Sequence, residues 1–188
     1  FFDENIIRRG EITDKKIQFF KGTDIPMPSL FEISNSGMCN RKCSFCPRSD
    51  PEYNHVNQFI SQELHNKIYS ELSEHEFSGS VIFSGFSEPL LDKKIYKQIE
   101  DIRIKLPNAN IELITNGDPI NHDRVEKLFN AGLSYLLVSA YDSEEQAIAF
   151  RKLLSETSVD PSKYIVRNRY YGEEKDFGIT LSNRGGNM

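Results

Sequence analysis

The fold class follows from one stretch, Ser80-Val81-Ile82-Phe83-Ser84, and from what comes after it. This apolar run ends in a polar loop, Gly85-Phe86-Ser87-Glu88-Pro89, which leads into a helical pattern. A run of β-branched and aromatic residues of this length is typical of a strand that is buried on both faces. Similar runs occur at residues 30–33, 111–115 and 135–139, and weaker ones occur at residues 164–166 and 179–181.

Amphipathic helices are predicted between these runs. Leu64, Ile68 and Leu72 recur at four-residue spacing after Ser61, a residue type that caps helices. Three further helical faces follow Asp92, Asn121 and Ser143, and Pro107 and Gly132 end the first two of them. The apolar residues of these faces are Ile95, Ile99, Ile102 and Leu106, then Val125, Leu128 and Phe129, then Ala147, Phe150, Leu153 and Leu154.

Strands and helices therefore alternate at roughly 25 to 30 residues, which predicts βα units and a parallel sheet. We expect an α/β fold of the partial (β/α)6, TIM-like barrel type, because a full eightfold barrel needs about 250 residues and this chain has 188. Residues 1–28 do not fit the repeat and are expected to form an N-terminal extension, with a strand or part of a hairpin at residues 15–20. Residues 29–188 are expected to form a single core domain, because no linker clearly divides them.

The composition excludes several classes of partner. Lys and Arg number 23 and Asp and Glu number 28, so the chain is mildly acidic, which argues against a general nucleic-acid binder. No stretch approaches the roughly 20 apolar residues of a membrane-spanning helix, and no secretory leader is visible. The chain begins at Phe1 and ends in a turn-like segment, residues 182–188, so we expect it to be a piece of a longer protein.

The cysteines are few and clustered. Cys39, Cys43 and Cys46 are the only three, and they lie within eight residues. Three cysteines this close together cannot cross-link distant parts of a fold by disulfides, so a secreted disulfide scaffold is excluded. We expect a reducing, cytoplasmic setting and a site that uses thiolates.

The spacing of the cysteines suits a metal group. A two-residue gap lets two thiolates hold one metal or one face of a cluster, and the three-residue gap brings in the third thiolate. Three thiolates on a four-iron cluster leave one iron without a protein ligand, which is the open position that chemistry requires. Arg41 and Lys42 would offset negative charge there, and Phe45 would shield the cluster from water.

Two other interpretations of the cysteines stay open. A zinc-bound Cys3His interaction module would need a fourth ligand, and His55 or His65 is the candidate. A redox disulfide between Cys43 and Cys46 would leave Cys39 unexplained. Both His65 and His75 lie on or near a helical pattern, where we otherwise expect them at the surface.

The remaining unusual residues all follow predicted strands. In parallel α/β sheets the functional residues lie in loops just after the carboxyl ends of the strands. The loops expected at that edge contain the cysteines, the turn at residues 85–89, Asn116-Gly117, and Ser139 with Tyr141.

These features resemble a known family. The segment Cys39-x3-Cys43-x-Phe45-Cys46 is similar to the signature of the radical S-adenosylmethionine (radical SAM) enzymes, including the aromatic residue before the last cysteine. Residues 84–90 are similar to the Gly-Gly-Glu-Pro turn of that family, with Ser87 in place of the second glycine. The resemblance spans roughly residues 28–186, with the motifs in the same order.

The resemblance implies a [4Fe–4S] cluster and S-adenosylmethionine as cofactors. Cys39, Cys43 and Cys46 would bind three irons, and the amino and carboxylate groups of S-adenosylmethionine would chelate the fourth. Reductive cleavage would yield methionine and a 5′-deoxyadenosyl radical that abstracts hydrogen from a peptide or small-metabolite substrate. The electron would come from an external donor of the flavodoxin or ferredoxin type.

The resemblance also implies cofactor-binding residues after the second strand and in the cysteine loop. Backbone groups of Gly85, Phe86 and Ser87 would meet the amino group of the cofactor, and Glu88 would fix that turn. Phe45 would lie near the adenine, although simple core packing is the alternative.

The later strands are expected to contribute polar contacts. Thr115, Asn116 and Ser139 would bond ribose hydroxyls or the cofactor carboxylate, with a cap or turn role as the alternative. Arg167 would pair with that carboxylate, with Arg169 as its competitor and an outward, solvated arginine as the alternative.

The tail is similar to one subgroup. Ser182-Asn183-Arg184-Gly185-Gly186 resembles the end of the barrel in radical SAM enzymes that carry a C-terminal SPASM or twitch domain. We therefore expect such a domain to follow in the native protein, with peptides among its substrates.

Overall fold

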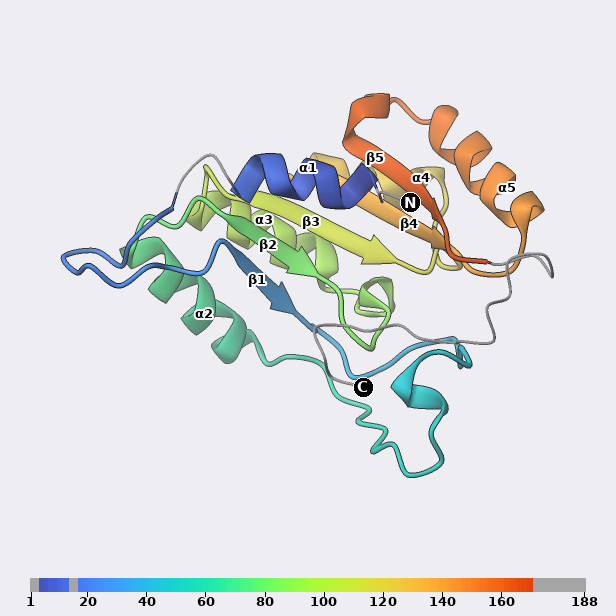
Figure 1. Cartoon of the computed structure of the whole chain (residues 1–188), viewed down its shortest axis with the longest axis horizontal. Coiled ribbons are helices and arrows are strands. Elements are labelled where there is room, and N and C mark those ends of the chain that lie inside the picture. The colour runs from blue at the N-terminus through green and yellow to red at the C-terminus, as the bar shows by residue number, and fades with distance from the viewer. Residues whose placement is uncertain (1–3, 14–16, 171–188) are drawn as a thin grey trace.

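The computed structural model describes residues 4–13 and 17–170, and five parallel strands within them form one sheet (Figure 1). The strands are β1 (Leu30–Ile33), β2 (Ser80–Phe83), β3 (Asn110–Thr115), β4 (Tyr135–Ala140) and β5 (Tyr164–Asn168). Their order in the sheet is their order in the chain, and each neighbouring pair is parallel. This confirms the predicted α/β class with an open, partial TIM-like barrel. The sixth strand candidate, residues 179–181, lies outside the described residues.

Four helices connect the strands: α2 (Gln62–Glu74), α3 (Ile95–Lys105), α4 (His122–Asn130) and α5 (Glu144–Ser155). Ser61, Asn121 and Ser143 cap α2, α4 and α5 as predicted, because each side chain accepts a hydrogen bond from a backbone N–H in the first helical turn. Three short 3-10 turns follow Cys46, Glu88 and Asp160, namely η1 (Pro47–Ser49), η2 (Pro89–Leu91) and η3 (Pro161–Lys163).

The hydrophobic core lies between the sheet and helices α2 to α5. Val81, Phe83, Ile111 and Leu113 point to this side and are fully buried. Burying a large apolar side chain contributes roughly 1.5–3 kcal/mol, so this face supplies most of the stability. The predicted face of α3 lies against it, through Ile95, Ile99, Ile102 and Leu106.

The predicted face of α2 is wrong by one residue. Leu64 is exposed, whereas His65 is fully buried and its ring lies edge-on to Tyr69 at 4.4 Å between ring centroids. The buried positions of this helix are His65, Tyr69 and Leu72, which also follow helical spacing. His65 is therefore a core residue and not the surface residue that we expected.

A helix near the N-terminus covers the other face of the sheet. Helix α1 (Glu4–Thr13) lies over the strands on the side away from α3 and α4 (Figure 1). Arg8 and Arg9 donate to Glu112 of β3 at 2.8 and 3.0 Å, and that carboxylate is 1% exposed. The guanidinium of Arg8 also lies 3.7 Å above the ring of Tyr135 on β4. The inner face is therefore closed at the amino ends of these strands.

The segment after α1 forms a small antiparallel contact between Phe19 and Pro26, so the candidate strand at residues 15–20 is part of a hairpin-like turn where it is described. The predicted division at residue 28 stays a prediction. None of the described helices is long and apolar enough to cross a membrane.

Candidate cofactor site

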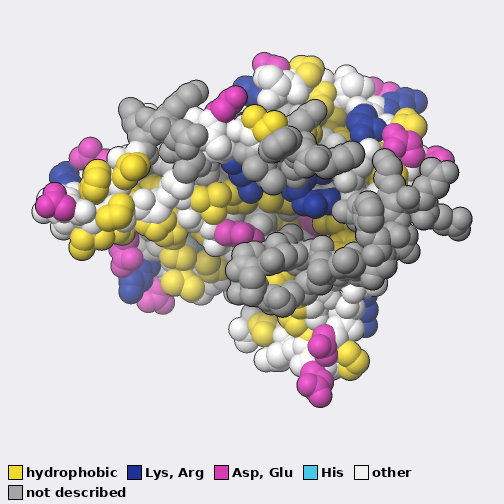
Figure 2. Space-filling view, in the orientation of Figure 1, with side chains coloured by type: hydrophobic (Ala, Val, Ile, Leu, Met, Phe, Trp, Pro, Cys, Tyr) yellow, Lys and Arg dark blue, Asp and Glu magenta, His cyan; other side chains and the backbone are white. Residues whose placement is uncertain are grey.

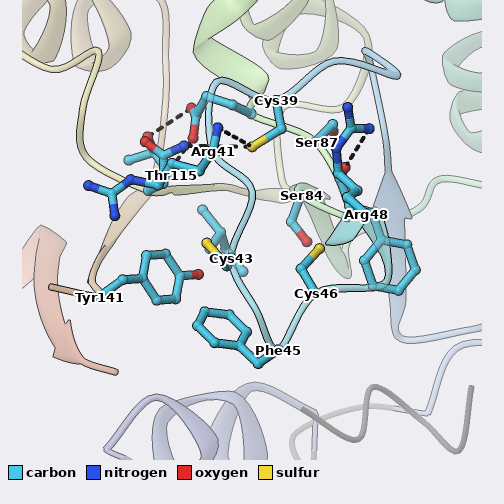
Figure 3. Close-up of a pocket in the computed structure, with 15 residues that line it drawn as sticks. Cys39, Arg41, Cys43, Phe45, Cys46, Arg48, Ser84, Ser87, Thr115 and Tyr141 are labelled. Atoms are coloured by element: carbon cyan, nitrogen blue, oxygen red, sulfur yellow. Dashed lines mark hydrogen bonds between the residues drawn. The ribbon is translucent and has the colours of Figure 1, made fainter. Parts of the chain in front are cut away.

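The three cysteines lie in one pocket at the carboxyl ends of the strands (Figure 3). They belong to the loop after β1, and all three are half-buried free thiols. The N–H of Cys46 donates to the carbonyl of Cys43 at 2.9 Å, a turn that directs the last two side chains to the same cavity. Burial raises the pKa of the Cys43 thiol, and the nearby charge of Arg41 opposes that rise.

The pocket takes its walls from four strand ends. Its empty space, including solvent at the open mouth, is about 620 Å³. The lining residues are Cys39, Arg41, Cys43, Phe45, Cys46, Arg48, Ser84, Gly85, Phe86, Ser87, Glu88, Ile114, Thr115, Asn116 and Tyr141. Seven of the nine predicted cofactor-binding residues are among them.

The turn after β2 needs its glycine. Gly85 has a φ of +114°, and a Cβ there would overlap the Ser34 hydroxyl oxygen. A larger residue would therefore be strained and would collide with the end of β1. The backbone N–H of Glu88 donates to the carbonyl of Met38 at 2.8 Å, so the turn is fixed against the start of the cysteine loop.

The carboxylate of Glu88 joins the ends of β2 and β3. It is 1% exposed and accepts hydrogen bonds from the Thr115 hydroxyl and the Asn116 N–H at 2.8 Å each, and from the Leu90 N–H at 3.1 Å. Burial raises the pKa of Glu88, and these hydrogen bonds work against the rise. The side chain therefore braces the wall of the pocket from behind.

Asn116 has a turn role and a site role together. Its side-chain oxygen accepts from the N–H of Asp118 at 3.0 Å, which makes the local turn. Its amide nitrogen donates to the Asn40 side chain at 2.8 Å and reaches the sulfur of Cys39 at 3.9 Å. The end of β3 is thus tied directly to the cysteine loop.

Two aromatic rings form the apolar wall. Phe45 and Tyr141 lie 5.2 Å apart between ring centroids, tilted by 34°, and both line the pocket (Figure 3). Phe45 comes from the cysteine loop and Tyr141 from the end of β4. Together they shield that side of the cysteines from water.

Arg48 is a functional candidate that the sequence analysis missed. Its side chain lies in η1, two residues after the last cysteine, and is 7% exposed. Its Nη1 donates to the carbonyls of Gly37 at 2.7 Å and Phe86 at 3.3 Å. The only sequence signal was a charged residue next to a ligand motif.

The pocket contains buried polar atoms that suit an electron-rich ligand. Within the described residues, Arg48 Nε and Ser87 Oγ have no hydrogen-bond partner although both are buried. A buried donor without a partner is costly, so an acceptor in the pocket would be stabilised there. The sulfides and thiolates of an iron–sulfur cluster and the carboxylate of S-adenosylmethionine are acceptors of this kind, so the residues present fit both groups.

Two predicted cofactor residues are not among the residues that line the pocket. Ser139 is buried in β4, and Arg167 is its partner in the register of β5, so both belong to the inner face of the sheet. Their contact with a cofactor stays a prediction.

The arrangement gives little support to the zinc alternative. His65 is packed against Tyr69 inside the fold, and exposed His55 lies against Tyr53 at 5.1 Å between ring centroids. In the part of the chain that the structure describes, no three His, Cys, Asp or Glu side chains are grouped as ligands of a single metal ion. One zinc ion would hold every sulfur at about 2.3 Å, whereas a four-iron cluster distributes its three thiolates over separate irons.

Comparisons with known proteins agree with this geometry. The family model for the radical SAM superfamily matches residues 33–168. The chain is 26% identical over 158 residues to the S-adenosyl-L-methionine-dependent 2-deoxy-scyllo-inosamine dehydrogenase of Niallia circulans, covering 84% of this chain and 60% of that protein. It is 30% identical over 136 residues to the biotin synthase of Francisella tularensis subsp. holarctica, covering 70% of this chain and 41% of that enzyme.

A solved structure has the same fold. The crystal structure of BtrN in complex with AdoMet and 2-DOIA matches with a TM-score of 0.66 and 23% sequence identity, over 76% of this chain and 57% of that one. The chain thus spans less than two thirds of the length of each of these relatives. Because the family model covers more than half of the chain and includes the cysteines and the strand-end turns, the chain belongs to the radical SAM superfamily, whose cofactors are a [4Fe–4S] cluster and S-adenosylmethionine.

Proposed function

We propose that this protein is an enzyme that cleaves S-adenosylmethionine reductively and abstracts a hydrogen atom from a small-molecule substrate. The observation that carries the proposal is the gathering of three free thiols and the polar turns of β2 and β3 in one pocket. Cys39, Cys43 and Cys46 would hold the cluster. When bound, the reduced cluster and S-adenosylmethionine supply a 5′-deoxyadenosyl radical.

The residues of the chain prepare the pocket for this chemistry. Glu88 holds the turn after β2 in position, so that Gly85 to Ser87 present their backbone to the cofactor. Phe45 and Tyr141 keep water from the reactive side, which protects a radical from side reactions. An external electron donor of the flavodoxin or ferredoxin type and a reducing, cytoplasmic compartment are part of the proposal.

A hydroxylated or amino-bearing small molecule is the substrate class that we favour. Two curated relatives are a dehydrogenase of 2-deoxy-scyllo-inosamine and a biotin synthase. In this chain Ser84 lines the pocket and donates to the carboxylate of Glu32, which lies exposed on the inner face of β1. A carboxylate next to the pocket suits hydroxyl or ammonium groups. A peptide substrate and a C-terminal SPASM or twitch domain remain predictions from the sequence.

The test is anaerobic purification followed by metal and sulfide analysis. We expect about four iron and four sulfide per chain, and formation of 5′-deoxyadenosine when dithionite and S-adenosylmethionine are added. Cys43→Ser is the matched control and should give neither. One zinc per chain with no cleavage of S-adenosylmethionine would contradict the proposal.

The substrate class has its own test. Deuterated amino-cyclitols and polyols are offered in one set and deuterated peptides in another, and deuterium in 5′-deoxyadenosine is measured by mass spectrometry. Deuterium transfer from the first set supports a small hydroxylated substrate. Transfer from peptides alone would overturn that choice.

A further inference from the structure

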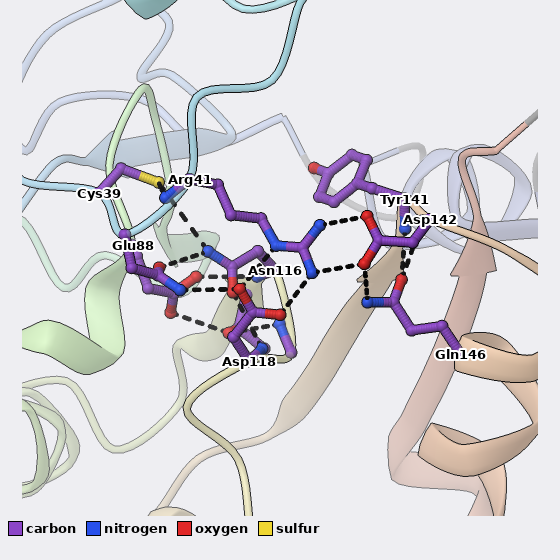
Figure 4. A network of polar contacts seen from close by, with 11 residues as sticks. Cys39, Arg41, Glu88, Asn116, Asp118, Tyr141, Asp142 and Gln146 are labelled. Atoms are coloured by element: carbon purple, nitrogen blue, oxygen red, sulfur yellow. Dashed lines mark hydrogen bonds and ion pairs between the residues drawn. The ribbon is translucent and has the colours of Figure 1, made fainter.

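The arginine between the first two cysteines makes most of the hydrogen bonds that hold this loop to the strand ends (Figure 4). Arg41 Nε donates to Asp118 Oδ2 at 2.6 Å, and Nη2 donates to the other oxygen of the same carboxylate. Nη1 and Nη2 also donate to the two oxygens of Asp142, at 2.7 and 2.8 Å. Asp118 follows β3 and Asp142 follows β4, so one side chain joins the cysteine loop to two strand ends.

Each carboxylate of this group is itself held in place. Gln146 of α5 donates to Asp142 Oδ2 at 2.6 Å, and its side-chain oxygen accepts from the backbone N–H of Asp142 at 3.0 Å. Asp118 accepts from the side chain of Asn40 at 2.8 Å. Asp142 is thus fixed by α5, and Asp118 accepts hydrogen bonds from both Asn40 and Arg41 of the cysteine loop.

These bonds account for the attachment of the loop. Within the described residues, all hydrogen bonds between residues 40–46 and the ends of β3 and β4 involve Asn40 or Arg41. The neighbouring Lys42 is exposed and makes no hydrogen bond or ion pair with the described residues. Of these two adjacent cations, only Arg41 therefore attaches the loop to the strand ends.

The charges around Arg41 indicate that its main role is to attach the loop to the strand ends rather than to neutralise the thiolates. The Arg41 side chain is 16% exposed, and its fork lies on two carboxylates, which is the strong, bidentate form of a charge-assisted hydrogen bond. The pKa of Arg41 is raised by these two bonds, and the pKa of Asp142 is lowered by its bond to Arg41. Since one positive charge meets two negative ones, the group has a net charge of −1.

We propose that Arg41 is a positioning residue that fixes the three-cysteine loop over the strand ends before a cluster binds, with Asp118 and Asp142 as its anchors. The part of this inference that concerns a cluster rests on the proposed function. The anchoring contacts are made by this chain's own residues, and they do not depend on the proposed function. The net negative charge beside the cluster would also favour its oxidised form.

The first experiment uses the protein before reconstitution. Amide hydrogen exchange of residues 40–46 is compared among the wild type, Arg41→Met and Lys42→Met. We expect exchange in that segment to become at least about tenfold faster in Arg41→Met, with no change in Lys42→Met. Equal protection in all three proteins would overturn the proposal whatever the protein binds.

The second experiment uses the reconstituted protein. Release of iron to a chelator should be at least about tenfold faster in Arg41→Met than in the wild type. Arg41→Lys should be intermediate, because an ammonium keeps the charge without the planar fork. Asp142→Asn should shift the midpoint potential of the cluster to more positive values, a change that a purely structural role would not produce.

The two proposals fail in different ways. If the wild-type protein binds no iron but Arg41→Met still loosens residues 40–46, the proposed function fails and the anchoring role stands. If the wild type binds a cluster, and Arg41→Met holds it at the same release rate and potential, the function stands and the role of Arg41 is refuted.

Discussion

The two faces of the sheet are built differently, although every strand contributes to both. The face under α2 to α5 is apolar and closed, as Val81, Phe83 and Leu113 show. The opposite face carries polar and charged side chains among apolar ones such as Ile82 and Leu137, namely Glu32, Ser84, Glu112, Ser139 and Arg167. Figure 2 shows Lys and Arg side chains gathered in a hollow among apolar ones on the surface seen in that view.

The difference between the faces shows that one face of the sheet supplies the core, whereas the other lies toward the candidate site. Successive residues of a strand point to opposite faces, so a strand can serve the core with one set of residues and the site with the other. The inner face is itself divided, because α1 covers its amino end through Glu112 and the cysteine pocket occupies its carboxyl end. Substitutions on the two faces should therefore have separable effects.

The largest expected effect is on the pocket side. Cys43→Ala should abolish cluster retention and cofactor cleavage, because it removes one of the three proposed thiolate ligands. The free energy of unfolding should change little, because the thiol is only half-buried in a loop at the strand ends. Iron analysis and thermal unfolding measure the two quantities. A variant with full iron and activity would break the assignment.

The core side should give the opposite result. Phe83→Ala removes a fully buried ring from the apolar face and should cost about 3–5 kcal/mol of stability. The protein that remains folded should keep its iron, because Phe83 points away from the pocket. Chemical denaturation and iron per folded molecule check this. Loss of the cluster without loss of stability would contradict the separation of the faces.

Patterns that depend on neighbours in the sequence were predictable. The apolar runs gave five strands within a few residues of their bounds, and Ser61, Asn121 and Ser143 gave the helix starts. The meeting of the cysteine loop with the turns of β2 and β3 followed from the geometry of parallel sheets alone. These features need no knowledge of distant contacts.

Features that depend on distant partners were not predictable. Helix α1 contains Gly10 and its two arginines pair with Glu112, a residue about one hundred positions away in the chain. Arg41 was expected to offset thiolate charge, and its charge does oppose the rise in the pKa of Cys43. Its ion-pair partners, Asp118 and Asp142, could not be predicted, because no local pattern pairs them with it. The burial of His65 was missed because the apolar Leu64 and Ile68 favoured a different face of α2.

A smaller effect on stability is expected from Glu88, whose carboxylate joins the ends of β2 and β3. Burial raises the pKa of Glu88 above its ordinary range, so the folded protein holds a proton there that the unfolded chain releases. The contribution to stability should therefore fall as pH rises from the ordinary glutamate range to the raised pKa. Unfolding measured across pH in wild type and Glu88→Gln isolates this contribution. An identical pH profile in both proteins would show that Glu88 ionises normally.

The smallest expected effect is that of Ser143 at the start of α5, and it tests whether a residue on the core side influences the pocket. Ser143 caps α5 by accepting a hydrogen bond from the N–H of Gln146, whose side chain holds Asp142 at the edge of the pocket. Ser143→Ala should cost about 1 kcal/mol of stability, the usual loss for a helix cap. If the helix start only supports the core, iron retention stays at the wild-type level. Asp142 also anchors Arg41. Faster iron release in Ser143→Ala would therefore show that the start of α5 helps to position the cysteine loop. The effects of substitutions on the two faces would then not be separable at this residue.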